Sequence, residues 1–222
     1  MKKVFLILLF ASSNTLACLN DYEGPDSAIG FKINKSVDLI KRGHYKNAIK
    51  MLVEVNDQDA DHYEVAANLG TAYELNGNNE LAKIWIARGL VLNPNAHKGT
   101  EWLHVDVLEA KLNIEKQPDW LKTHSIIKLG ANYGSEYKIE ALQYQLTERT
   151  KFVKPKDDIV ADMYYLLGVE TYNLALKNSA CLRGMKDQVV DAFNKSLLYG
   201  ELRKKEIKEI NIRCAFTCSC SK

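Results

Sequence analysis

The residues best suited to chemistry are five histidines, at positions 44, 62, 97, 104 and 124, one of which follows a glutamate by three residues. Glu101 and His104 form a Glu-x-x-His unit, which places the two side chains on one face of a helix. Di-iron bundle proteins use this unit twice, with two more glutamates from other helices, whereas the sequence has one copy. It also has no HExxH, GxSxG, P-loop or GxGxxG motif. We therefore interpret Glu101 and His104 as a surface pair on a helix, and we expect no catalytic residue, no metal site and no cofactor.

Cysteine is the second residue type that could carry chemistry. The thiolates of Cys214, Cys218 and Cys220 could bind copper(I) or zinc, but their spacing lacks the paired CxxC of structural zinc sites. In an oxidising compartment thiols pair instead, and Cys181 completes an even set of four. Three pairings could satisfy this set, and the sequence does not choose among them. We predict disulfides that involve the C-terminal tail.

The N-terminus has the organisation of a secretory signal peptide. Two lysines precede an apolar run from Val4 to Ala11, which is too short to span a bilayer. Small residues then lead to a cleavage position after Ala17, so we predict export and removal of residues 1–17. The tripeptide that ends at Cys18 resembles the end of a bacterial lipobox, and lipidation of this cysteine would tether the protein to a membrane. A periplasmic protein and a membrane-anchored lipoprotein stay open as alternatives.

The charge balance bears on the class of partner. Removal of residues 1–17 takes away two of the 30 basic residues and leaves 28 basic against 28 acidic residues. Binding to nucleic acid requires a net basic footprint. We therefore exclude nucleic acid as the main partner.

A sequence repeat spans Tyr63 to Asn95. Counted from Tyr63 as position 1, its marked positions are 7, 8, 11, 15, 20, 24, 27 and 32, occupied by Leu69, Gly70, Tyr73, Gly77, Ala82, Ile86, Gly89 and Pro94. This pattern resembles the tetratricopeptide repeat family. Gly43 and Ala48 precede Gly77 and Ala82 by 34 residues each, so the resemblance covers about residues 29–95. It implies antiparallel helix pairs that stack into a short solenoid.

The marked residues have steric reasons. Gly70 and Ala82 are small at the positions where the two helices of a hairpin cross. Gly77 ends the first helix in a conformation that favours a residue without Cβ. The predicted buried stripe consists of Leu69, Tyr73, Ile86 and Leu90.

The predicted fold is all-α, a solenoid of helical hairpins that continues into an irregular helical C-terminal half. Apolar periodicity predicts further helices over about residues 28–42, 98–115, 137–152, 157–176 and 185–202. We divide the chain into a signal peptide (1–17), a tetratricopeptide-repeat region (18–117) and a divergent helical region with a cysteine-containing tail (118–222).

The resemblance implies a function in protein binding. In this family the first helices of the hairpins line a concave groove that holds a peptide or a partner protein. We expect an exported interaction or scaffold module whose groove suits a partner with lysine or arginine; its oligomeric state stays open. A hydrolase or metal-dependent enzyme on a helical scaffold is the alternative, because carboxylates on distant helices leave no local signature. Carried over by position, the groove residues are Glu64, Ala67, Thr71 and Glu74, followed by Lys98, Glu101, Val105 and Leu108.

Overall fold

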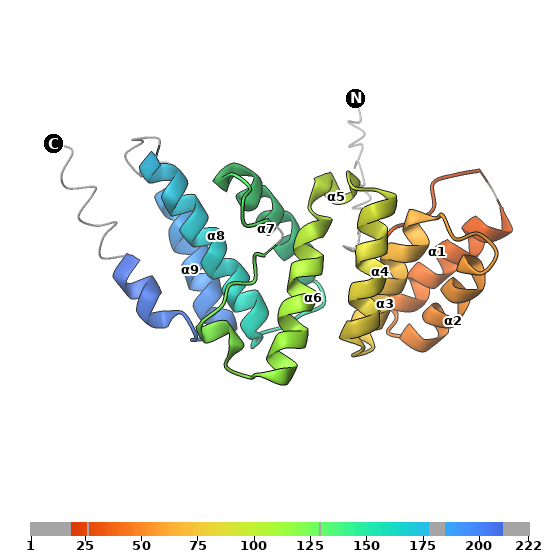
Figure 1. The fold of residues 1–222 in the computed structure, drawn as a ribbon, viewed down its shortest axis with the longest axis horizontal. Helices are drawn as coiled ribbons and strands as arrows, with labels where there is room; N and C mark the ends of the chain where they lie inside the picture. Colours follow the sequence, from red (N-terminus) through yellow and green to blue (C-terminus); the bar gives the residue numbers. More distant parts are fainter. Residues whose placement is uncertain (1–18, 26, 129, 178–184, 211–222) are drawn as a thin grey trace, which may run out of the picture.

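The computed structural model describes residues 19–25, 27–128, 130–177 and 185–210, and these residues contain helices and no β-strand (Figure 1). The predicted signal peptide and the five cysteines lie outside the described residues. No described helix is both long enough and apolar enough to cross a membrane. The helices are α1 (Ala28–Lys41), α2 (Tyr45–Asn56), α3 (Tyr63–Leu75), α4 (Asn79–Leu92), α5 (Ala96–Gly99), α6 (Glu101–Lys116), the 3-10 helix η1 (Trp120–Lys122), α7 (Ser135–Arg149), α8 (Asp158–Lys177) and α9 (Lys186–Tyr199).

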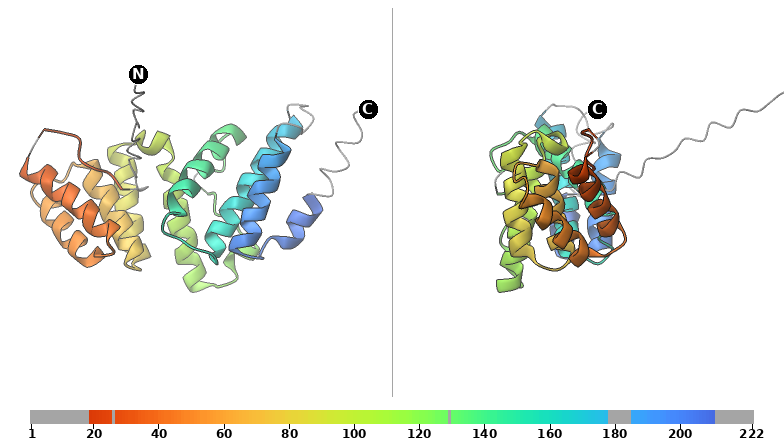
Figure 2. Two further views of the ribbon diagram at one scale, coloured as in Figure 1. Left: turned by 180° about the vertical axis from the view of Figure 1, so that it is seen from behind. Right: turned by 90° about the vertical axis from the view of Figure 1, so that its right-hand side faces the viewer.

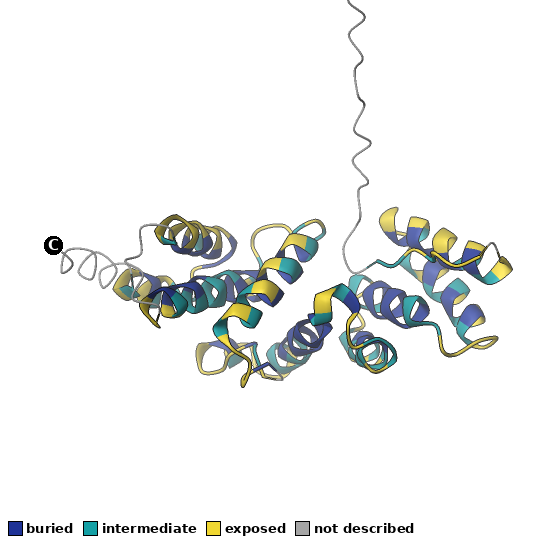
Figure 3. Ribbon diagram, turned by 90° about the horizontal axis from the view of Figure 1, so that it is seen from above, coloured by how far each residue is buried: buried dark blue, intermediate teal, exposed yellow. Residues whose placement is uncertain are grey.

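Helices that follow one another in the chain pack in pairs, α1 with α2, α3 with α4 and α8 with α9, while α6 packs on α4 and α7 on α8. The pairs form an elongated row with α1 and α2 at one end, and at the other end α8 and α9 are followed by a short helix over residues 204–210 (Figure 1). Viewed from the end of the row, α1 and α9 lie toward one side, and α4 and α6 lie toward the other (Figure 2). The row is therefore curved, and residues 19–25 run along its concave side (Figure 3).

The first two hairpins have the same turn, 34 residues apart. Gly43 and Gly77 follow the first helix of each pair with φ angles of 78° and 83°, in the left-handed region that favours glycine. In each turn the glycine N–H donates to the carbonyl three residues back at 2.9 Å, and the next N–H donates to the carbonyl five residues back, at 2.8 or 2.9 Å. This is a Schellman helix ending. The predicted role of Gly77 is confirmed, and the 34-residue spacing is reproduced in the backbone geometry.

Glycine also sets the distance between paired helices. A Cβ at Gly70 would overlap the side chain of Ile86 and lie 3.0 Å from its backbone nitrogen. Ala82 is also fully buried, and it belongs to a cluster with Ile86 of α4 and with Val105 and Leu108 of α6. At Gly168 on α8, a Cβ would overlap the ring of Phe193 on α9. The prediction that a small residue allows close helix crossing is confirmed at Gly70, and for Ala82 it stays a prediction.

The predicted helix over 98–115 begins later than expected. His97, Lys98 and Gly99 have φ angles of 50°, 61° and 74°, so three successive residues adopt left-handed backbone. Left-handed backbone costs a residue with a Cβ about 1–2 kcal/mol, and such strain persists only where the surrounding structure holds it. The chain therefore turns sharply at α5 before α6 begins at Glu101.

Candidate functional site

Glu74 on α3 is a nearly buried carboxylate surrounded by three cationic groups. Its Oε1 accepts hydrogen bonds from Lys111 Nζ at 2.6 Å and from Arg149 Nη1 at 2.5 Å, and its Oε2 accepts from His104 Nε2 at 2.7 Å. Burial by itself would raise the pKa of Glu74, but the charges of Arg149, Lys111 and His104 hold it well below its usual value. Because His104 and Lys111 lie on α6 and Arg149 on α7, one carboxylate joins three helices.

A second buried carboxylate, Glu101, continues this network. Its Oε2 lies 2.6 Å from His97 Nδ1, and its Oε1 lies 3.4 Å from His104 Nδ1. Burial would raise the pKa of Glu101, but hydrogen bonds from His104 and His97 lower it to about 2. The interpretation of Glu101 and His104 as a surface pair is wrong, because their exposed fractions are 0% and 1%. Glu74 of α3 covers His104, and α7 lies against the start of α6, where Gln145 donates to Thr100 and Tyr137 meets Trp102.

His97 occupies the end of this network and faces the N-terminal segment. Its ring stacks on Tyr144 of α7 at 5.5 Å between centroids and meets Tyr63 edge-on at 6.2 Å. Its Nε2 lies 3.1 Å from the side-chain oxygen of Asn20. The left-handed turn at 97–99 therefore directs an imidazole toward the concave side, between α3 and α7.

Two asparagines hold the backbone of the N-terminal segment. Asn68 on α3 accepts from the N–H of Asn20 and donates to its carbonyl, both at 2.8 Å. Asn34 on α1 makes the same pair of bonds with Tyr22, at 2.6 and 3.4 Å. In an extended chain, alternate residues direct their N–H and C=O groups to the same side, and the intervening Asp21 is exposed. The segment is thus held through its main chain at every second residue.

The side chains of the segment also fit the surface. Leu19 and Tyr22 pack on the apolar cluster that α1, α2 and α3 share. The ring of Tyr22 lies over Gly30, where a Cβ would overlap it, and meets the ring of His62 edge-on at 5.8 Å. Two successive helical hairpins therefore contribute to one continuous binding surface.

The residues predicted to line an acidic groove are mostly covered. Glu64 keeps 28% of its side chain exposed and lies 3.9 Å from His62. The carboxylates of Glu74 and Glu101 are engaged by cations or histidines of the chain itself, while Lys98 is exposed, 3.9 Å from Glu140. A role of these residues in partner binding stays a prediction. The other predicted groove residues are buried, namely Ala67, Thr71, Val105 and Leu108, of which Val105 and Leu108 pack with Ala82 and Ile86 of α4.

Sequence reasoning missed Asn34 and Asn68, although a signal was present. The two asparagines are 34 residues apart, the same spacing that relates Gly43 to Gly77. Asn68 is also a polar residue inside the apolar run from Val65 to Gly70, and it is fully buried. A search for repeated polar residues in the 34-residue register would have found the pair.

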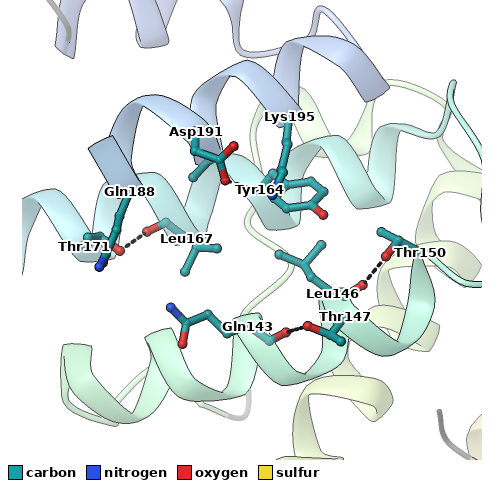
Figure 4. Close-up of a pocket in the computed structure, with 11 residues that line it drawn as sticks. Gln143, Leu146, Thr147, Thr150, Tyr164, Leu167, Thr171, Gln188, Asp191 and Lys195 are labelled. Carbon is teal, nitrogen blue, oxygen red and sulfur yellow. Dashed lines mark hydrogen bonds and ion pairs between the residues drawn. The ribbon is translucent and has the colours of Figure 1, made fainter. Parts of the chain in front are cut away.

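Two cavities border α7. A small one, of about 70 Å³, borders Glu74, His104 and Arg149, and it has room for a few water molecules. A larger one, of about 430 Å³, lies between α7, α8 and α9 (Figure 4). The three threonine hydroxyls that line it each donate to a carbonyl of their own helix, at 2.7–2.8 Å. Those hydroxyl protons are therefore not directed toward a ligand.

No three described His, Asp or Glu residues form a group that could hold a metal ion. Comparisons of the chain with protein-family models, with curated proteins and with solved structures found no match.

Proposed function

We propose that the protein is an exported interaction module that binds an extended polypeptide segment of a partner on the concave side of tetratricopeptide-type hairpins. The observation that carries this proposal is the pairing of Asn68 and Asn34 with the backbone of residues 20 and 22. Paired bonds from a carboxamide to an N–H and a C=O recognise a main chain whatever its side chains are.

The 34-residue equivalence of the two asparagines supports the same proposal. Equivalent positions on neighbouring repeats face the same side of a solenoid, so successive hairpins present equivalent amides. Alternate residues of an extended chain are about 6.6–6.8 Å apart. An extended polypeptide can therefore engage one amide per hairpin. Because Glu74 and Glu101 are paired internally, we assign the affinity to main-chain recognition and apolar contact, with a smaller part for partner charge.

Selection from a displayed library of random peptides tests this function. The baits are the mature chain and a variant whose N-terminal segment is weakened, Asn20→Ala/Tyr22→Ala. Selected peptides should bind at least about tenfold more weakly after Asn68→Ala or Asn34→Ala, because each change removes two hydrogen bonds. Asn47→Ala, at an exposed position of α2, is the matched control and should leave affinity unchanged. Failure of both baits to select peptides that depend on the asparagines would refute the function.

Export and anchoring belong to the same proposal and have their own test. The mass of the purified native protein should correspond to a chain that begins at Cys18. An added diacylglyceryl group would assign it to the membrane face, and an unmodified cysteine to the periplasm. A mass that includes residues 1–17 would refute export.

A further inference from the structure

We infer that residues 19–22 are the resident occupant of the binding site, and that the partner segment replaces them with a similar pattern, an asparagine followed two residues later by an aromatic residue. This inference rests on the proposed function. It adds the kind of sequence that the site accepts and the way in which the chain itself controls access.

The main-chain contacts define where the occupant lies. Both partners of the backbone, Asn68 and Asn34, are on first helices of their hairpins, and they hold residues 20 and 22 in register. These four hydrogen bonds use only peptide groups of the segment. A segment from another protein could form all four without sharing any side chain.

Asn20 identifies the first side-chain position. Its Oδ1 lies 3.1 Å from His97 Nε2, and the other ring nitrogen of His97 lies 2.6 Å from Glu101. The carboxylate fixes the ring orientation, so the imidazole presents Nε2 to the occupant. A side-chain amide can pair with this nitrogen, whereas an aliphatic side chain would leave it without a partner.

Tyr22 identifies the second position. Its ring lies between Gly24 and Gly30, and a Cβ on either glycine would overlap it. The edge-on contact with His62 and the packing on the cluster of α1, α2 and α3 complete an aromatic site. Beside it lies an open cavity of about 500 Å³ bordered by Phe31, whose exposed fraction is 68%. A partner with a longer segment has apolar surface to cover here.

The resident segment can be displaced because its fit is incomplete. The side-chain nitrogen of Asn20 is buried and finds no acceptor among the described residues, and a buried donor without an acceptor weakens binding. The segment connects to α1 directly, since the N-cap of α1 is Ser27. A short connection gives an effective concentration on the order of millimolar, so a partner in trans must bind well to compete.

A labelled peptide with the sequence of residues 19–25, LNDYEGP, tests the inference by fluorescence anisotropy. It should bind the Asn20→Ala/Tyr22→Ala chain at least about tenfold more tightly than the unchanged mature chain, because the unchanged segment competes in cis. Asn68→Ala in the variant background should weaken this binding at least about tenfold, and a peptide with alanine in place of its asparagine and tyrosine should bind the variant chain at least about tenfold more weakly than LNDYEGP does. Equal affinity for the unchanged and variant chains would overturn the inference.

These experiments distinguish a failure of the inference from a failure of the proposed function. If library peptides bind through Asn34 and Asn68 but LNDYEGP does not, the inference fails and the function stands. If neither binds, both fail.

Hydrogen exchange on the unchanged protein provides a measurement that needs no variant. The N–H groups of Asn20 and Tyr22 should be protected, and a saturating library peptide should remove that protection. Persistent protection with the peptide bound would overturn the inference, as would a stable dimer in sedimentation in which copies exchange their segments.

Discussion

Substitution of Glu74 by glutamine tests whether the buried charge network organises the centre of the molecule. The change keeps the shape of the side chain and removes one negative charge from among His104, Lys111 and Arg149. The side chains of Glu74 and Arg149 are 8% and 7% exposed, so water cannot readily replace the lost carboxylate. Removal of one partner from a buried ion pair costs about 3–5 kcal/mol. In a chain of this size each kcal/mol lowers the Tm by about 2–4 °C, so we expect a fall of about 6–20 °C.

Thermal and urea denaturation followed by circular dichroism measure this effect. Glu64→Gln is the matched control because Glu64 lies on the same helix, keeps 28% of its side chain exposed and lies 3.9 Å from the His62 imidazole. An exposed pair of this kind contributes less than about 1 kcal/mol. A double-mutant cycle with Arg149→Met should give a coupling energy of about 1–3 kcal/mol. Equal losses for Glu74→Gln and Glu64→Gln, or no coupling, would refute the assigned role of Glu74.

Four further predictions concern the hairpins and the pH dependence. Gly70→Ala should destabilise the fold by about 1–2 kcal/mol, because overlap with Ile86 outweighs the gain in helix propensity. Gly89→Ala should stabilise it by about 0.5–1 kcal/mol, because the nearest heavy atom to the new Cβ is 3.6 Å away; urea denaturation of both variants checks the opposite signs. Gly77→Ala should cost about 1 kcal/mol through its positive φ alone, and Gly77→Asn should cost less, which the same titration measures. The pKa of Glu101 is lowered to about 2 in the fold, so its stabilisation should be fully present above about pH 4.5 and be lost as the pH falls toward 2. Urea titrations between pH 6 and pH 2.5 should show that acid lowers the free energy of unfolding less for Glu101→Gln than for the unchanged protein. An equal decrease for the two proteins would contradict this assignment.

The sequence predicted the parts of the fold that depend on local pattern. Gly77 and Gly70 have short-range steric roles, and both were visible in the spacing of the repeat. The burial of Glu101 and His104 could not be predicted in this way, because it depends on α3 and α7 lying against the start of α6. No local signal specifies which distant helix covers a face. Left-handed backbone at Lys98, inside the predicted helix over 98–115, was also unexpected, since a lysine has no local preference that would overcome its cost.

The role of Asn34 and Asn68 was only partly predictable from the sequence. Their 34-residue spacing was present in the sequence, but one polar residue per repeat has no evident role until a bound main chain is seen. The occupant itself explains why they were missed: it comes from the same chain, immediately after the predicted cleavage position.

The position of residues 19–22 has a consequence for how the protein would stand on a membrane. If Cys18 carried a lipid, only Leu19 would lie between the lipidated residue and Asn20, whose backbone Asn68 holds. The concave side would then lie against the lipid headgroups. Release of residues 19–25 by a partner would free seven residues, which extend to about 25 Å at 3.3–3.6 Å per residue. Partner binding would thereby increase the height of the folded body above the bilayer, and this change could be measured as a distance between a membrane dye and a label on α9.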